Sequence, residues 1–87
     1  MTVRVLTDGT IELRDSCPAD DAEPLLQYLT AAPDAPVDWR SCVAAHAAVI
    51  QVLLAARPAL NGPPAGEFLR QHIEPLVTRL PPHGDAT

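Results

Sequence analysis

Residues 37–56, VDWRSCVAAHAAVIQVLLAA, decide the fold of this chain. The first three, Val37 to Trp39, are typical of a short buried strand, which we expect to lead through a tight turn into a helix. Arg57 and Pro58 end that helix, because proline cannot continue it. The apolar residues of the helix occupy nearly its whole circumference, which predicts burial on more than one side. They are Val43, Ala47, Ile50, Val52, Leu53 and Leu54.

Asp8 and Gly9 predict a hairpin near the start of the chain. The pair separates two β-prone runs, and both residues tolerate the positive φ angles of a two-residue type I′ turn. Apolar and polar residues alternate along both runs, so one face of the hairpin should be buried. The apolar positions are Val3, Val5, Ile11 and Leu13.

Two further helices are predicted, one on each side of residues 37–56. The first follows Asp20 or Asp21, either of which can cap it, and it ends near Ala32. The second covers residues 65–80 and is kinked at Pro75. Each has an apolar stripe, formed by Ala22, Leu25, Leu26 and Leu29 in the first and by Leu69, Ile73, Leu76 and Leu80 in the second.

Together these elements predict an α/β fold, a small mixed sheet of three or four strands with three helices largely on one face. A fourth strand would be formed by residues 59–61, in the loop before the last helix. A chain of 87 residues has room for one domain, which we assign to residues 1–80. Residues 81–87 have no pattern and are expected to be a disordered tail.

Charge and apolar patterning exclude several classes of partner. Eleven acidic residues against six arginines give a net charge of −5, which repels phosphate backbones and excludes nucleic acid. The N-terminus lacks the basic region and apolar run of a secretory signal. Residues 44–56, the longest apolar stretch, are too short to insert across a membrane. We therefore expect a cytoplasmic protein in which Cys17 and Cys42 are free, partly buried thiols.

Cys42 and His46 are the residues that offer chemistry. Four positions apart on a continuous helix, they would share a face, but a metal site needs three or four ligands. The other candidates are Cys17, His72 and His83, so we expect no metal and no cofactor, and interpret His46 as a satisfied residue at a helix start. A helix N-terminus lowers the pKa of a thiol. A small enzyme or ligand-binding domain built on Cys42 and His46 is therefore an alternative, although no catalytic residue is expected.

The order hairpin, helix, strand, helix, loop, helix, together with residues 37–56, resembles a STAS domain. That module is shared by anti-sigma factor antagonists and the cytoplasmic ends of sulfate transporters, and the resemblance covers roughly residues 2–78. Asp38 matches the aspartate of the family's strand. Residues 46–49 fall where the family has an Asp-Ser-x-Gly-like signature, and residues 52–56 match the body of the helix that follows it.

This chain is similar to a divergent and shortened form of that module. The resemblance places the family's phosphorylatable serine or threonine on Ala47, the acidic residue before it on His46 and the glycine after it on Val49. Because alanine has no hydroxyl group, the usual kinase-driven switch is not expected at this position.

The resemblance implies a non-catalytic protein–protein interaction module in a bacterial regulatory or signalling complex. The expected partner is a regulatory kinase or a sigma-regulator-like protein. The residues expected to contact it are Arg40, Ser41, His46 and Ala47, with Trp39 as a possible anchor. A self-associating structural module is a further alternative, because a small sheet with helices on one side leaves apolar surface to cover.

Overall fold

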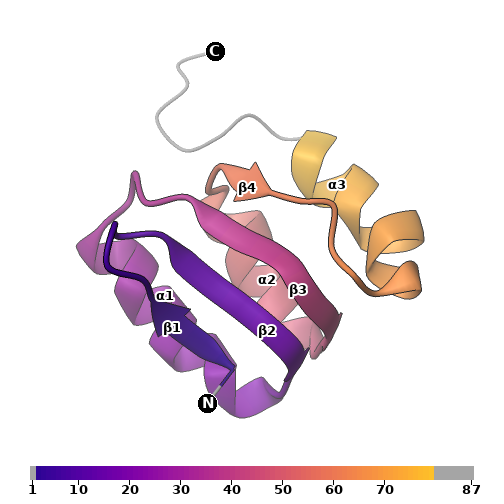
Figure 1. Ribbon diagram of the computed structural model, residues 1–87, viewed down its shortest axis with the longest axis horizontal. Coiled ribbons are helices and arrows are strands. Elements are labelled where there is room, and N and C mark those ends of the chain that lie inside the picture. Colours follow the sequence, from indigo (N-terminus) through magenta and orange to yellow (C-terminus); the bar gives the residue numbers. More distant parts are fainter. Residues whose placement is uncertain (1, 80–87) are drawn as a thin grey trace.

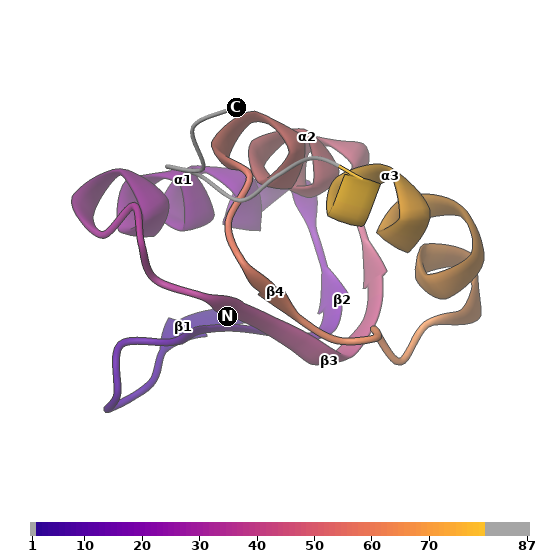
Figure 2. The ribbon, with the colours of Figure 1, turned by 90° about the horizontal axis from the view of Figure 1, so that it is seen from above.

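The computed structural model describes residues 2–79, which form one mixed sheet with helices on one of its faces (Figures 1 and 2). The strands are Val3–Val5 (β1), Ile11–Cys17 (β2), Val37–Ala45 (β3) and Leu60–Asn61 (β4), and the α-helices are Ala22–Ala31 (α1), Ala47–Ala56 (α2) and Glu74–Arg79 (α3). The strand order is β1-β2-β3-β4, with β1 antiparallel to β2 and the other pairs parallel. The predicted α/β fold is confirmed, while Leu80 and the predicted tail at residues 81–87 lie outside the described residues.

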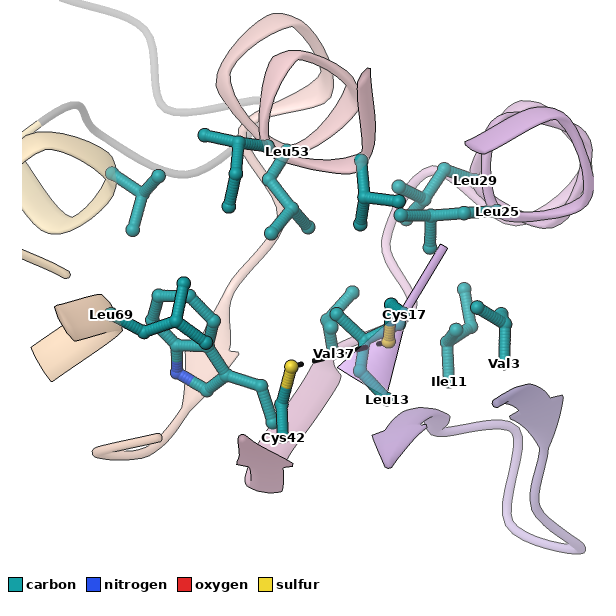
Figure 3. Packing of buried hydrophobic residues seen from close by; sticks show 14 residues of the cluster. Val3, Ile11, Leu13, Cys17, Leu25, Leu29, Val37, Cys42, Leu53 and Leu69 are labelled. Atoms are coloured by element: carbon teal, nitrogen blue, oxygen red, sulfur yellow. Dashed lines mark hydrogen bonds between the residues drawn. The ribbon is translucent and has the colours of Figure 1, made fainter. Parts of the chain in front are cut away.

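The hydrophobic core lies between the sheet and the helices (Figure 3). Its buried members include Val3, Ile11, Leu13, Val37 and Trp39 on the strands and Leu25, Leu29, Val49 and Leu53 on the helices. The predicted burial of Leu53 is confirmed, whereas Leu54 is only partly buried. The predicted stripe of α1 is wrong at Leu26, which is 47% exposed.

β3 is much longer than the predicted strand of residues 37–39. Its register against β2 shifts twice, and at each shift β3 contains one residue more than β2. Each of these β-bulges moves the next inward side chain one position along the strand. The side chains that face the core are Val37, Trp39, Cys42 and Ala45. The last three are three residues apart, which imitates a helical period and explains why residues 42–45 resembled the start of a helix.

The hairpin of β1 and β2 forms at the predicted place but with a different turn. Gly9 has a positive φ of 93° and Asp8 does not, so the predicted type I′ turn is wrong. Backbone hydrogen bonds join Leu6 to Gly9 (2.9 Å) and to Thr10 (2.7 Å), which gives a three-residue loop with glycine at its third position. The alternating apolar and polar pattern predicted that Val5 is buried, but it is 48% exposed at the end of β1.

Asp21 has a different role from the predicted helix cap. It is the last residue of a short 3₁₀ turn, Ala19–Asp21, and makes no side-chain hydrogen bond to the first N–H groups of α1. Instead it is 5% exposed, and its carboxylate accepts hydrogen bonds from the backbone N–H of Thr2 (3.3 Å) and from the Thr2 hydroxyl group. Asp21 therefore ties the residue before β1 to the beginning of α1.

The predicted third helix is interrupted before Pro75. A π-helical turn, Leu69–Ile73, precedes α3. This wider turn lies just before Pro75, which has no N–H group to donate to a helical hydrogen bond. The wider turn also changes the phase of the apolar stripe. Leu76, expected in the stripe, is 49% exposed, and Val77 is buried in its place with 6% exposed.

Candidate functional site

The structure buries Trp39, the expected anchor of a binding surface. It is 0% exposed, because the inward positions of β3 place its indole beneath the helices. The backbone of Gly62 covers the ring so closely that a Cβ atom there would lie 2.5 Å from the indole Nε1. That N–H group has no hydrogen-bond partner within residues 2–79. Trp39 is a core residue, and the expectation that a partner contacts it is corrected accordingly.

Arg40 and Ser41 are both exposed, since the first bulge of β3 interrupts the alternation at this point. The guanidinium group of Arg40 donates two hydrogen bonds to the Asp38 carboxylate, at 3.0 and 2.8 Å, and the backbone N–H of Arg40 donates a third at 3.0 Å. These bonds hold the pKa of Asp38 below its usual range. The ion pair fixes the arginine side chain but adds little stability at an exposed position.

Where the four strands are in register, the face of the sheet opposite the helices is polar. Arg4, Glu12, Asp38 and Asn61 lie in register across the four strands. Glu12 pairs with Arg4 (2.8 Å) and lies 3.9 Å from Arg14. We call Arg4, Glu12, Arg14, Asp38 and Arg40 the open sheet face. Its charges are largely paired with one another, so this face does not need a covering layer.

His46 and Ala47 begin α2 at the opposite end of β3 from Trp39. His46 is the N-cap: its Nδ1 accepts a hydrogen bond from the backbone N–H of Ala48 at 3.0 Å, and its own N–H donates to the carbonyl of Cys17 at 2.9 Å. The interpretation of His46 as a satisfied residue at a helix start is confirmed. Arg40 lies six positions earlier in the chain, roughly 20 Å of extended strand, so the expected site residues do not form one patch.

Cys42 and His46 do not share a helix face, and that expectation is wrong. Cys42 lies on β3 with its thiol in the core, whereas His46 is exposed. The Sγ atom of Cys42 instead lies 4.0 Å from that of Cys17 (Figure 3). A hydrogen bond from Cys42 lowers the pKa of Cys17 to about 7, and the same bond together with burial raises the pKa of Cys42. The predicted helix effect on Cys42 is therefore absent, because the residue precedes the helix.

An apolar groove lies between the first half of α2 and the π-helical turn. It is lined by Ala45, Ala47, Ile50, Gln51, Phe68, Leu69 and Ile73, and has a volume of about 380 Å³. We call these residues the α2 groove. Gln51 is their one polar side chain, and Ala47 is the one member that was predicted as a site residue. The groove is therefore the surface that lies nearest to the predicted binding residues His46 and Ala47.

Phe68 forms one wall of the α2 groove and is 66% exposed. Its ring packs against His72, with the ring centroids 5.0 Å apart. The apolar stripe predicted for residues 65–80 did not indicate Phe68 as a site residue. The available signal was that Phe68, one of three aromatic residues in the chain, lies outside that stripe.

The segment that carries Phe68 is fixed against β3. The N–H group of Gly66 donates to the carbonyl of Cys42 at 3.0 Å, and a Cβ atom at Gly66 would lie 2.6 Å from the carbonyl carbon of Val43. The guanidinium group of Arg70 donates to the carbonyls of Ala65 (2.9 Å) and Pro64 (3.3 Å). The exposed aromatic ring is thus held on a constrained backbone.

A second groove lies between the C-terminal ends of α1 and α2. It is lined by Leu26, Leu29, Thr30, Pro33, Ala55, Ala56 and Arg57, and its volume is also about 380 Å³. Size therefore does not distinguish the two grooves. The second is more polar, with Thr30 and Arg57 in its wall, and it has no exposed aromatic residue.

Residues 2–79 contain no cluster of three or more histidine, cysteine, aspartate or glutamate side chains that could hold a metal ion. Over the same residues, no helix is both long enough and apolar enough to cross a membrane. Comparisons of the chain with protein families, with curated proteins and with solved structures found no match.

Proposed function

We propose that this chain is a non-catalytic protein-binding module whose contact surface is the α2 groove. The observation that carries the proposal is Phe68, a large aromatic side chain that is 66% exposed on a segment fixed by Gly66 and Arg70. Aromatic side chains on a rigid backbone beside a pocket are typical of residues that dominate binding energy. Because the ring is largely exposed, it contributes much less to the hydrophobic core of its own chain than a buried aromatic side chain would.

The lining of the groove favours a partner that inserts an apolar side chain. Ile50, Leu69 and Ile73 provide aliphatic surface, while Ala45 and Ala47 leave room close to the backbone. A charged side chain of a partner inserted into this groove would lose its hydration without meeting an opposite charge. The chain as a whole carries −5, which attracts basic residues outside the groove. The proposed occupant is therefore an amphipathic helix of a partner protein, with apolar anchors flanked by lysine or arginine.

The proposed partner is a regulatory protein of a bacterial signalling complex in the cytoplasm, such as an anti-sigma kinase or a related sigma regulator. This part rests on the resemblance to STAS domains, which assigns the family's signature to residues 46–49. Ala47 belongs both to that signature and to the α2 groove. Resemblance and surface chemistry thus support the same end of α2. With alanine at the acceptor position, the proposed binding is not switched by phosphorylation there.

Site-specific photo-crosslinking in the native host tests the proposal. A crosslinking residue at position 68 is compared with one at position 26, because Leu26 is also an exposed apolar residue (47%) but lines the second groove. The protein trapped at position 68 is then purified and titrated by calorimetry against the wild-type, Phe68→Ala and Leu26→Ala chains. We expect Phe68→Ala to raise the Kd about tenfold or more, as for a residue central to an interface, and Leu26→Ala to leave it unchanged.

Equal affinities of the wild-type and Phe68→Ala chains would refute the proposed surface. Sedimentation of the purified chain provides the second arm. A dimer that forms with rising concentration and is lost in Phe68→Ala, but not in Leu26→Ala, would replace the regulatory partner by a second copy of the chain.

A further inference from the structure

We propose that Cys17 and Cys42 are a modification site, at which oxidation by peroxide forms an intrachain disulfide between β2 and β3. The two residues are 25 positions apart in sequence, and the fold brings their Sγ atoms to 4.0 Å inside the core (Figure 3). The site is separate from the α2 groove, and its existence does not depend on the proposed binding function.

The arrangement of the strands favours this pair over any contact with another molecule. Cys17 is 2% exposed and Cys42 is 0% exposed, so neither thiol can reach a second chain without unfolding. A disulfide has an S–S distance of about 2.05 Å, so the sulfur atoms must approach by roughly 2 Å. In the sheet Cys42 lies opposite Asp15, and Cys17 lies opposite Ala45. This diagonal offset means that the bond needs a small shift of the backbone as well as side-chain rotation.

The backbone is already irregular where the shift is needed. Asp15 has a positive φ of 54°, and the register between β2 and β3 changes between Asp15 and Ser16. A bulge leaves residues outside the regular ladder, so the strands can move there without breaking a continuous row of hydrogen bonds. The carbonyl of Cys17 also accepts the N–H of His46, the N-cap of α2. Movement of Cys17 is therefore transmitted to the first turn of that helix.

The two thiols have complementary roles in the reaction. The Cys42 thiol can donate a hydrogen bond to a Cys17 thiolate and lowers the pKa of Cys17 to about 7, so Cys17 is the nucleophile. Its thiolate attacks one oxygen of hydrogen peroxide, the O–O bond breaks, and a sulfenic acid and hydroxide form; the hydroxide takes up a proton to become water. The sulfur of Cys42 then attacks the Cys17 sulfur. The S–S bond forms, the S–O bond breaks, and the Cys42 proton leaves with the hydroxyl group as a second water.

Access and reversibility fit a sensor more closely than a permanent crosslink. Cys17 stands at the end of β2, near Thr2 and the short edge strand β1, and peroxide is little larger than water. In a reducing compartment a disulfide of this kind forms transiently and is reversed by cellular thiols.

Thiol counting by mass spectrometry tests the site on the full chain. Folded, reduced protein is treated with hydrogen peroxide, quenched, denatured and alkylated, and the same treatment is applied to the chain unfolded in urea. We expect the folded protein to lose the mass of two hydrogens, to take up no alkylating reagent and to regain both reactive thiols with dithiothreitol. The unfolded chain should form the disulfide more slowly, because the fold no longer holds the sulfur atoms together.

Cys42→Ser is the matched variant, since it keeps the nucleophile and removes the resolving thiol. It should accumulate a Cys17 sulfenic acid that dimedone traps, whereas Cys17→Ser should stay unmodified. Several results on the folded wild-type chain would overturn the site: two alkylated thiols after peroxide, oxygen adducts without the two-hydrogen loss, disulfide-linked dimers, or a rate equal to that in urea. Because the decisive measurement uses the wild-type chain, it stands even if a serine variant fails to fold.

Discussion

Replacing Gly66 by alanine should separate the segment that carries Phe68 from β3. The added Cβ atom would overlap the carbonyl oxygen of Val43 and lie 2.6 Å from its carbonyl carbon, closer than Cβ atoms approach other atoms in proteins. The obstructing atoms belong to the backbone of a strand, so no side chain can move aside. The segment itself must retreat, and the 3.0 Å hydrogen bond from Gly66 to Cys42 is then lost.

The expected destabilisation follows from these two effects. Overpacking against a rigid neighbour costs about 1–3 kcal/mol, and loss of a backbone hydrogen bond costs about 0.5–1.5 kcal/mol. The free energy of unfolding should therefore fall by about 2–4 kcal/mol, a large part of the stability of so small a domain. Urea denaturation measures this directly, since Trp39 is the single tryptophan, is buried and reports unfolding by its fluorescence. With an m value of about 1.5 kcal/mol/M the midpoint should fall by roughly 2 M.

Gly9→Ala is the matched control for this experiment. It adds the same atom at a position where nothing lies within 4 Å, so only its φ of 93° is unfavourable. We expect a loss of about 1 kcal/mol there. If Gly66→Ala were no more destabilising than Gly9→Ala, the segment would not be packed against β3. The position of Phe68, and with it the α2 groove, would then be incorrect.

Three further predictions concern the core, the hairpin and modification of the chain. Leu53→Ala should lower the free energy of unfolding by about 2–5 kcal/mol because Leu53 is 1% exposed. Leu54→Ala should lower it by clearly less, because Leu54 is only half-buried. Equal losses of stability in thermal unfolding would contradict the orientation of α2. Gly9→Val should lower the Tm more than Gly9→Asn, since a β-branched residue is poorly tolerated at positive φ whereas asparagine accepts it; an unchanged Tm for both would mean that the turn is elsewhere. Ser41 should carry no phosphate in the native host, because it lies on β3 and not at the start of α2; an intact mass with a phosphate mapped to Ser41 would restore a phosphorylation switch.

The fold class could be predicted from the sequence where local patterns agree with the final environment. Ile11 and Leu13 alternate with polar neighbours and are buried, and the segment around Leu53 is apolar enough to form the central helix. Gly9 indicated the turn, although the number of loop residues depends on a register that no local pattern contains.

Other features depend on interactions that a single sequence does not reveal. The two bulges of β3 moved Cys42 from an expected helix to the core of the sheet, because a three-residue spacing is common to a helix and to a bulged strand. The π-helical turn likewise changed which side chain faces the core, so that Val77 is buried and Leu76 is exposed. Of the expected site, Ala47 lines a groove, whereas Trp39 does not reach the surface. The other wall of that groove comes from residues some twenty positions later, which only the tertiary fold brings near.

The open sheet face makes the molecule electrically asymmetric. Its three arginines and two carboxylates leave it with a charge of +1, while the whole chain carries −5, so all other residues together carry −6. The open sheet face is therefore slightly positive on a chain that is negative as a whole. A basic surface would attract the rest of the chain and weakly repel this face, so encounters that begin with the open sheet face are disfavoured. This bias weakens as salt shortens the range of the field.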